Sequence, residues 1–172
     1  MECIEAIKGR RSIRKFKDRA VGKEIIDEML NVAQMAPSAG NLQARDFIVV
    51  SNKITKQKLT TAALGQSFIE QAPVVIVVIA NIERSSRIYR SRGELYAIQD
   101  ATAGIENMLI AAHSMGLGAC WVGAFNEDEV SVLLGIPDKT LPVAIIPLGY
   151  PDEQPSEPPR MAMDRLVHWE TW

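Results

Sequence analysis

The stretch Val74-Val75-Ile76-Val77-Val78-Ile79 decides the fold, because it consists only of β-branched apolar side chains. Such residues favour strands, and a run of this length is short for a helix. The lack of alternating polar residues indicates a strand that is buried on both faces. Helices must then flank the sheet to which this strand belongs. Further strands are predicted at residues 47–50, 119–122, 143–148 and, near the end of the chain, 165–169.

Helices are predicted between these strands. In residues 23–35, apolar side chains recur at three- and four-residue spacing. The longest helix is predicted at 94–115, about 33 Å at 1.5 Å per residue, and its second half has so few charges that we expect it in the core or at a subunit contact. Shorter helices are expected at 2–8 and 54–64, and one more between the Asn126–Glu129 capping box and Gly135. This order predicts an α+β fold with a mixed central β-sheet, in which some strands are parallel through helical crossovers.

The length and composition restrict the class of protein. The chain has 172 residues, so we expect residues 1–172 to form a single domain, since chains divide only beyond roughly 250 residues. A net charge of −2 argues against a non-specific nucleic-acid binder. Two Cys and two His leave almost no material for a disulfide framework, a metal site or a His-based triad. No signal peptide and no membrane-spanning run of roughly 20 apolar residues is found, so a cytoplasmic location away from membranes is expected.

Residues 150–172 are expected to form an extended arm. Four prolines between positions 151 and 159 exclude a helix there. The arm nevertheless ends in apolar residues, including Leu166, Trp169 and Trp172. Apolar side chains on an arm need a surface to cover, and a second copy of the chain would supply one. The sequence therefore predicts a homodimer.

The segment Arg10-Arg11-Ser12-Ile13-Arg14 is the first candidate site. If it is extended, its side chains alternate, so Arg10, Ser12 and Arg14 share one side while Ile13 points to the core. Two guanidinium groups beside a hydroxyl suit a phosphate dianion, because Arg binds phosphate oxygens in pairs. A solvated basic strand is the alternative, and a nucleic-acid patch is less favoured because no aromatic residues are interleaved.

Two further segments are rich in small residues. The loop at 37–43 (PSAGNLQ) lies between a helix end and a strand, where it lets backbone approach a ligand; an ordinary turn is the alternative. The glycines in 116–124 follow a helix and have the wrong spacing for a dinucleotide fingerprint, so a Rossmann site is rejected. In the same segment, Trp121 beside Gly123 could present bare backbone to a flat ring. The alternative is a core strand with a glycine at a bulge.

Taken together and in order, these segments resemble the nitroreductase-like flavoproteins. The likeness extends over nearly the whole chain and includes residues 107–118 (NMLIAAHSMGLG) and the closing Gly149-Tyr150-Pro151, Pro159-Arg160 and Leu166-Val167-His168. The resemblance implies a homodimer with two FMN molecules at the subunit interface. It also implies an enzyme that uses NADH or NADPH to reduce FMN and passes electrons to nitroaromatics, quinones or similar small-molecule acceptors by a ping-pong route.

The same resemblance implies a role for each matching residue. Arg10, Ser12 and Arg160 would bind the FMN phosphate, with Arg11 in the same motif, and Arg14 would lie near the pyrimidine edge of the ring. The partner subunit would contribute Pro37, Ser38, Ala39, Asn41 and Gln43, while Trp121, Val122 and Gly123 would border the ring. No side chain is expected to be catalytic, because a flavin performs the hydride chemistry itself. Arg14 and the backbone at Gly123 would give electrostatic support.

The sequence departs from the family pattern in three places. Ala44-Arg45 stand where many members have Pro-Trp, and Ala39-Gly40 stand where Ser is common. The segment 84–93 is short where members often carry an insertion over the substrate, which predicts a more open pocket. Gln66 and Ser67 are the nearest candidates for further polar flavin contacts. The alternatives that stay open are a specialised relative such as a reductive dehalogenase, an FMN carrier or sensor without turnover, and a basic interaction module without cofactor.

Overall fold

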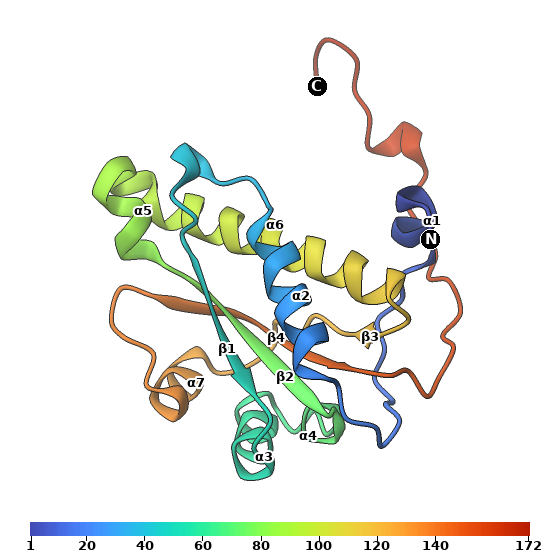
Figure 1. Cartoon of the computed structure of the whole chain (residues 1–172). Coiled ribbons are helices and arrows are strands. Elements are labelled where there is room, and N and C mark those ends of the chain that lie inside the picture. The colour runs from blue at the N-terminus through green and yellow to red at the C-terminus, as the bar shows by residue number, and fades with distance from the viewer.

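The computed structural model describes residues 1–172 and contains a four-stranded sheet in the order β1-β2-β4-β3 (Figure 1). The strands are β1 (Arg45–Val50), β2 (Val74–Ala80), β3 (Gly118–Ala119) and β4 (Leu141–Gly149). The apolar stretch at residues 74–79 forms β2, extended by one residue. All seven residues of β2 are buried, as predicted. This strand therefore lies at the centre of the fold.

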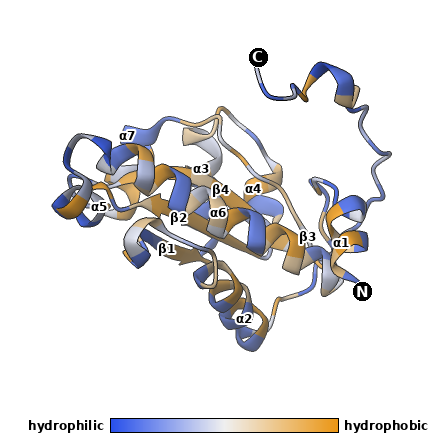
Figure 2. Cartoon of the chain, turned by 90° about the horizontal axis from the view of Figure 1, so that it is seen from above, coloured by the Kyte–Doolittle hydropathy of each residue, from blue (hydrophilic) through white to orange (hydrophobic).

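Helices cover both faces of the sheet. On one face, α2 (Lys23–Gln34) and α6 (Gly93–Ser114) pack on Val74, Ile76 and Val78; on the other, Val75 and Val77 belong to a second apolar cluster. That cluster includes residues from α3 (Lys53–Ala62), α4 (Phe68–Gln71) and α7 (Glu127–Leu134). Figure 2 shows the apolar faces of sheet and helices turned toward each other. The alternation of β2 side chains between two cores explains why the strand has no polar residue.

The remaining elements lie at the ends of α6. The helix α1 (Cys3–Gly9) contacts its C-terminal end, where the His113 side chain fills the space beside Gly9. The helix α5 (Ile82–Tyr89) and the short turn η2 (Arg90–Arg92) precede its N-terminal end, and the turn η1 (Ala39–Asn41) follows α2. The long helix is buried along one face, as predicted. No helix in the chain combines the length and apolarity needed to cross a bilayer.

The predicted capping box at the start of α7 is confirmed in part. The Asn126 side-chain oxygen accepts the Glu129 N–H at 3.1 Å, and Gly135 ends the helix with a left-handed φ of 64°. The reciprocal bond to the Asn126 N–H is not formed, because that N–H donates to the Ala62 carbonyl oxygen at 2.8 Å. The start of α7 is therefore tied to the end of α3.

The prediction of a mixed sheet with parallel strands is wrong. Each neighbouring pair, β1 with β2, β2 with β4 and β4 with β3, is antiparallel. A helix between two strands does not require a parallel crossover, since α3 and α4 return the chain to the end of the sheet that it left. Val50 at the end of β1 thus lies opposite Val75 near the start of β2. The only parallel contact is an isolated bridge between Ser12 and Ala119.

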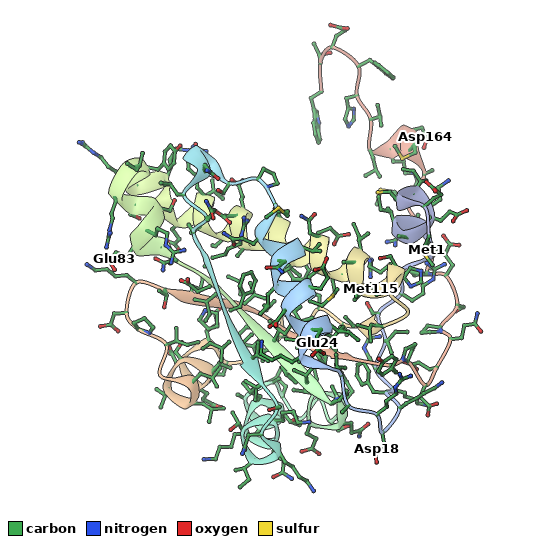
Figure 3. The ribbon with its side chains drawn as sticks, in the orientation of Figure 1. Met1, Asp18, Glu24, Glu83, Met115 and Asp164 are labelled. Atoms are coloured by element: carbon green, nitrogen blue, oxygen red, sulfur yellow. The ribbon has the colours of Figure 1, made fainter.

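Two strand predictions near the C-terminus also need correction. The strand predicted at 119–122 is regular only at Gly118–Ala119, although Val122 still bridges Ile145 in the same register. The final strand predicted at 165–169 does not form: Met163–Arg165 is a short helical turn, η3, and the residues after it are irregular. A strand needs a neighbour to accept its hydrogen bonds. The arm leaves the body of the chain, so it has none (Figure 3).

Candidate functional site

The segment after α1 is extended, as expected, and lies between β3 and the start of the arm. The Ile13 N–H donates to the Ala119 carbonyl oxygen at 2.9 Å, and Phe16 bridges Pro151. Ile13 is buried and packs so closely on Gly118 that a Cβ there would stand 2.7 Å from its side-chain atoms. This packing fixes which side of the segment faces outward.

Arg10, Ser12 and Arg14 line one cavity of about 310 Å³, as the alternation predicted. Arg11 lines it as well, whereas strict alternation would turn Arg11 to the side of Ile13. Arg160 also lines it, so the arm brings this arginine back to the N-terminal segment. The rest of the lining consists of Pro155, Ser156 and Pro158. No carboxylate is among the lining residues. We call this the arginine cavity, because four arginines and two serines line it.

Arg11 also has a structural role within the cavity wall. Its Nη1 donates to the carbonyl oxygens of Lys8 at 2.7 Å and Arg10 at 2.9 Å, so it satisfies the C-terminal end of α1. Its Nη2 lies 3.4 Å from the Glu157 carboxylate of the arm. The Nε of Arg11 is buried and has no hydrogen-bond partner in the chain. One donor in this wall therefore has no acceptor within the protein.

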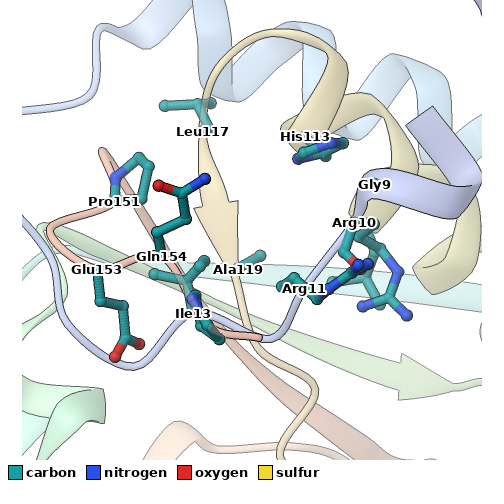
Figure 4. Close-up of a pocket in the computed structure, with 12 residues that line it drawn as sticks. Gly9, Arg10, Arg11, Ile13, His113, Leu117, Ala119, Pro151, Glu153 and Gln154 are labelled. Atoms are coloured by element: carbon teal, nitrogen blue, oxygen red, sulfur yellow. The ribbon is translucent and has the colours of Figure 1, made fainter. Parts of the chain in front are cut away.

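A second cavity, of about 270 Å³, adjoins the arginine cavity and shares Arg10, Arg11 and Pro155 with it. Figure 4 shows it between His113 on α6 and Glu153 and Gln154 on the arm. The Glu153 carboxylate accepts the backbone N–H groups of Arg14 at 2.5 Å and Lys15 at 3.0 Å. Those bonds hold the Glu153 carboxylate on the backbone of the N-terminal segment.

The residues after β3 lie beside the same N-terminal segment. Burial raises the pKa of the Cys120 thiol, and the charge of Arg14 opposes that shift. Trp121 is half-buried and Val122 is buried, whereas Gly123 is exposed. A Cβ on Gly123 would come no closer than 3.8 Å to any other atom, and its φ lies outside the left-handed region. Neither packing nor backbone geometry within this chain therefore requires glycine at this position.

The start of α4 completes this side of the site. The Gln66 Nε2 donates to the Ala124 carbonyl oxygen at 3.0 Å, next to Gly123, so one of the two candidates before the second strand is brought to the predicted ring-binding segment. The Arg14 guanidinium carbon lies 5.8 Å from the centre of the Phe68 ring. Sequence reasoning missed Phe68, because a lone aromatic on a four-residue helix gives no periodic signal.

The loop Pro37–Gln43 has an unusual backbone. Gly40, Asn41 and Gln43 all have left-handed φ values, of 57°, 54° and 50°. Within the loop, the Ser38 hydroxyl oxygen accepts the Gln43 N–H at 3.0 Å. Pro37, Ser38 and Ala39 border a cavity of about 270 Å³ whose other lining residues come from α6. These α6 residues are Tyr96, Gln99, Asp100 and Ala103.

A buried ion pair lies beneath this loop. Arg45 Nη1 lies 2.5 Å from Asp100 Oδ1, and both side chains are almost fully buried. Burial lowers the pKa of Arg45 and raises that of Asp100, while each charge opposes the shift of the other. Arg84 lies alongside and donates to the Asp46 carboxylate at 2.8 Å. Sequence reasoning missed this pair, for which the one available signal is an acidic residue within the apolar face of the long helix.

Within one chain, the Pro37–Gln43 loop and the arginine cavity are far apart. The loop precedes Arg45, which pairs with Ala80 at one end of β2, whereas Ala119 beside Ser12 pairs with Leu148, which lies opposite Val74 at the other end. They also lie at opposite ends of α6, near Asp100 and near His113, about 20 Å apart at 1.5 Å per residue. Figure 1 shows the same separation. The predicted site residues therefore form two separate groups in this chain.

The antiparallel sheet and its helices define an α+β protein, and comparison with known proteins gives its family. The family description "Nitroreductase family" matches residues 7–68 and 60–150. This chain belongs to the nitroreductase family, as the resemblance predicted.

Several relatives match this chain over most of their own length. A provisionally named NADH dehydrogenase/NAD(P)H nitroreductase of Methanothermobacter thermautotrophicus is 39% identical over 100% of this chain and 88% of its own. FMN reductase (NADPH) of Bacillus subtilis is 32% identical over 98% of this chain and 74% of its own. Among solved structures, the NADPH:FMN oxidoreductase from Vibrio harveyi complexed with NAD+ superposes with a TM-score of 0.92, at 28% identity over 99% of this chain and 77% of that one.

Proposed function

We propose that this chain is an FMN-dependent NAD(P)H oxidoreductase that acts as a homodimer with FMN at the subunit interface. Residues 1–172 would form one domain, with 150–172 as the arm. The observation that carries the proposal is the arginine cavity, whose lining has four arginines, two serines and no carboxylate. Such a donor set suits a phosphate dianion. Relatives named as FMN reductases support FMN as the phosphate ligand.

In this proposal, Arg10, Ser12 and Arg160 bind the FMN phosphate. Arg11 would contribute mainly its positive charge, because its Nη1 holds the end of α1, its Nη2 pairs with Glu157 and its Nε is buried. The wall of the cavity is preorganised by backbone bonds on both sides of the N-terminal segment. A preformed cationic cavity reduces the loss of conformational freedom on binding.

Arg14, Trp121, Val122 and Gly123 would border the flavin ring. When bound, FMN would supply the hydride chemistry, taking a hydride from NADH or NADPH and passing electrons on in a separate, ping-pong half-reaction. Arg14 would stabilise negative charge at the pyrimidine edge. Gly123 has no steric reason for lacking a side chain in this chain, so its bare backbone N–H is suited to donate to a ring that approaches closely.

The second subunit would contribute the Pro37–Gln43 loop. Pro37, Ser38, Ala39, Asn41 and Gln43 are too far from the arginine cavity of their own chain to line the same flavin. A symmetric dimer would unite the two groups at two equivalent sites. The arm supports this arrangement, since Trp169 and Trp172 are 83% and 100% exposed and need a surface to cover.

The electron acceptor would be a nitroaromatic, a quinone or a similar flat, small molecule. The corner formed by α5 and η2 is short, and the end of α5 lies against the Pro37–Gln43 loop, since a Cβ on Gly40 would stand 2.7 Å from the Tyr89 hydroxyl. A pocket covered only by this short corner would admit acceptors of varied shape. Relatives named as nitroreductases and flavin reductases support this class.

The test begins with the visible spectrum of the purified full-length protein. A flavin spectrum, or uptake of added FMN, is expected; a colourless protein that takes up no FMN would exclude the proposal. Anaerobic mixing with NADH and, separately, NADPH should bleach the flavin band, and a quinone or a nitroaromatic should restore it. Binding without bleaching by either donor would instead identify a carrier or sensor.

A further inference from the structure

The strongest unassigned feature is the contact between Arg45 and Asp100. We propose that this buried pair is a positioning element that holds the Pro37–Gln43 loop in its ligand-binding shape before any ligand arrives. The ligand is the flavin of the proposed function, on which this inference rests. Neither residue lines the arginine cavity, so both would act through the loop.

Arg45 holds the start of the loop. Its Nη2 donates to the carbonyl oxygens of Ala36 at 2.7 Å and Gln34 at 3.0 Å. These carbonyls lie at the C-terminal end of α2, where the helix leaves its last acceptors without partners. Arg45 thus satisfies the end of α2 and fixes the direction in which the chain enters the loop.

Asp100 holds the end of the loop. Its Oδ2 accepts the Ala44 N–H at 2.7 Å, and its Oδ1 accepts from Arg45 Nη1 at 2.5 Å. The Asp100 carbonyl oxygen accepts from the same Nη1 at 3.1 Å. One side chain on α6 therefore holds the residue after the loop and, through Arg45, the residues before it.

The backbone of the loop itself needs such support. Asn41 and Gln43 have left-handed backbones without being glycine, a conformation that persists only where the surrounding structure fixes it. Gln34 extends the ion pair to this strained part: its side chain accepts from Arg45 Nε at 3.5 Å and donates to the Gln43 side-chain oxygen. The predicted flavin contact Gln43 is thereby connected to the buried pair.

The long helix has space for this contact. One turn after Asp100, a Cβ on Gly104 would lie 3.2 Å from the Arg45 side chain and 3.1 Å from the Ala33 carbonyl oxygen. Glycine thus leaves room for the arginine stem. Replacing a buried ion pair by apolar residues of similar volume is often neutral or stabilising, so overall stability alone does not explain the pair. Its geometry explains a role in fixing the loop.

The test uses the paired variant Arg45→Met/Asp100→Leu, which removes both charges together. Amide hydrogen exchange of residues 37–44 is measured on the full-length protein before FMN is added, and the Kd for FMN is then determined by flavin fluorescence. Faster loop exchange and a Kd raised about tenfold are expected, as for a loop that is competent in about a tenth of the molecules. Unchanged exchange of the loop, or an unchanged Kd, would overturn the proposal.

A matched control separates positioning from general destabilisation. Lys56 is another buried cation, which donates to the Ala72 carbonyl oxygen on the opposite face of the sheet. Lys56→Met should lower the melting temperature without changing exchange in the loop. If the paired variant does not fold, Arg45→Lys keeps the charge beside Asp100 but loses the fork to Gln34 and Ala36, and it should show the same loop and Kd changes.

Failure of the proposed function and failure of the positioning role give different results. Wild-type protein that binds no FMN would reject the proposed function. Loop exchange without FMN tests the positioning role in either case, because it needs no cofactor. Equal loop exchange in wild type and in the variants rejects that role even if FMN binds.

Discussion

Ile13 packs directly against Gly118, with its side-chain atoms only 2.7 Å from where a Cβ on that glycine would stand. This contact sets how deeply the N-terminal segment lies against β3, and thus where Arg10, Ser12 and Arg14 face. We expect Gly118→Ala to lower the free energy of unfolding by about 1–3 kcal/mol, the usual cost of overpacking a tight site. Denaturant titration of the purified variant measures this loss.

The same substitution should also displace the arginine cavity. FMN binding is expected to weaken in Gly118→Ala at temperatures where the variant is still folded. A variant of wild-type stability would show that the backbone moves freely here, and it would contradict the close packing of the segment.

Unlike Gly118→Ala, Gly123→Ala should leave the stability of the fold nearly unchanged. A Cβ at this position meets no atom closer than 3.8 Å, so the stability should stay within about 0.5 kcal/mol of wild type. FMN binding should weaken, because the new methyl group would occupy the space of the approaching ring. Isothermal titration with FMN and thermal unfolding separate the two effects. Lost stability with intact FMN binding would assign the glycine to the fold instead of the site.

Some elements of this fold could be predicted from the sequence and others could not, for separate physical reasons. Local patterns predicted β2, α6 and the start of α7, because the burial of β2 and the cap at Asn126 depend on neighbouring residues. The antiparallel pairing of β1 with β2 was missed, since pairing depends on where α3 and α4 return the chain. The path through α3 and α4 is set by tertiary packing, which local sequence patterns do not contain.

Some residues of the candidate site could likewise be grouped from the sequence, and others could not. Strand alternation grouped Arg10, Ser12 and Arg14, and these residues line one cavity while Ile13 is buried. It did not predict that Arg11 lines the same cavity. Arg160 was placed in the same group only through a family resemblance. The contact between Arg45 and Asp100 joins residues 55 positions apart, so a local pattern could mark Asp100 as a buried acid but could not identify its partner.

Arg14→Ala and Arg160→Ala should both weaken FMN binding. Hydrogen bonds to charged groups contribute about 1.5–3 kcal/mol, so loss of the Arg160 contact should raise the Kd roughly 10- to 150-fold. Arg14→Ala should also slow turnover, because its charge would support the ring. Arg165, on the arm but outside the cavity, is the matched control, and Arg165→Ala should bind FMN like wild type. Wild-type affinity and turnover in Arg14→Ala would reject its role.

The two cysteines should differ in reactivity. Cys3 is exposed and Cys120 is buried, and burial raises the pKa of the Cys120 thiol. At pH 8 that thiol is therefore protonated to a greater extent than an exposed one, and its thiolate, the reactive form, is scarcer. Ellman's reagent should titrate one thiol in the native protein and two after denaturation. In Cys3→Ser, rapid native reaction would contradict the burial of Cys120.

The raised pKa of the Cys120 thiol also predicts how the free energy of unfolding changes with pH. The folded protein holds the Cys120 proton more tightly than the unfolded chain does, so stability falls as the pH rises above the ordinary thiol pKa. Cys120→Ala should remove that part of the pH dependence. Denaturant titration between pH 7 and 10 checks it, and identical slopes in both proteins would refute the assignment.

The arm offers a direct optical test of the proposed dimer. Trp169 and Trp172 are exposed in the single chain, whereas Trp121 is half-buried in the body, so Trp121→Phe leaves emission from the arm alone. If the arm covers a partner subunit, emission should shift to shorter wavelength as the protein concentration rises through the dimer dissociation constant. Sedimentation on the same samples reports the association state. Dimers that form without any shift would show that the arm does not lie on the partner, because buried indole rings cannot keep the emission of exposed ones.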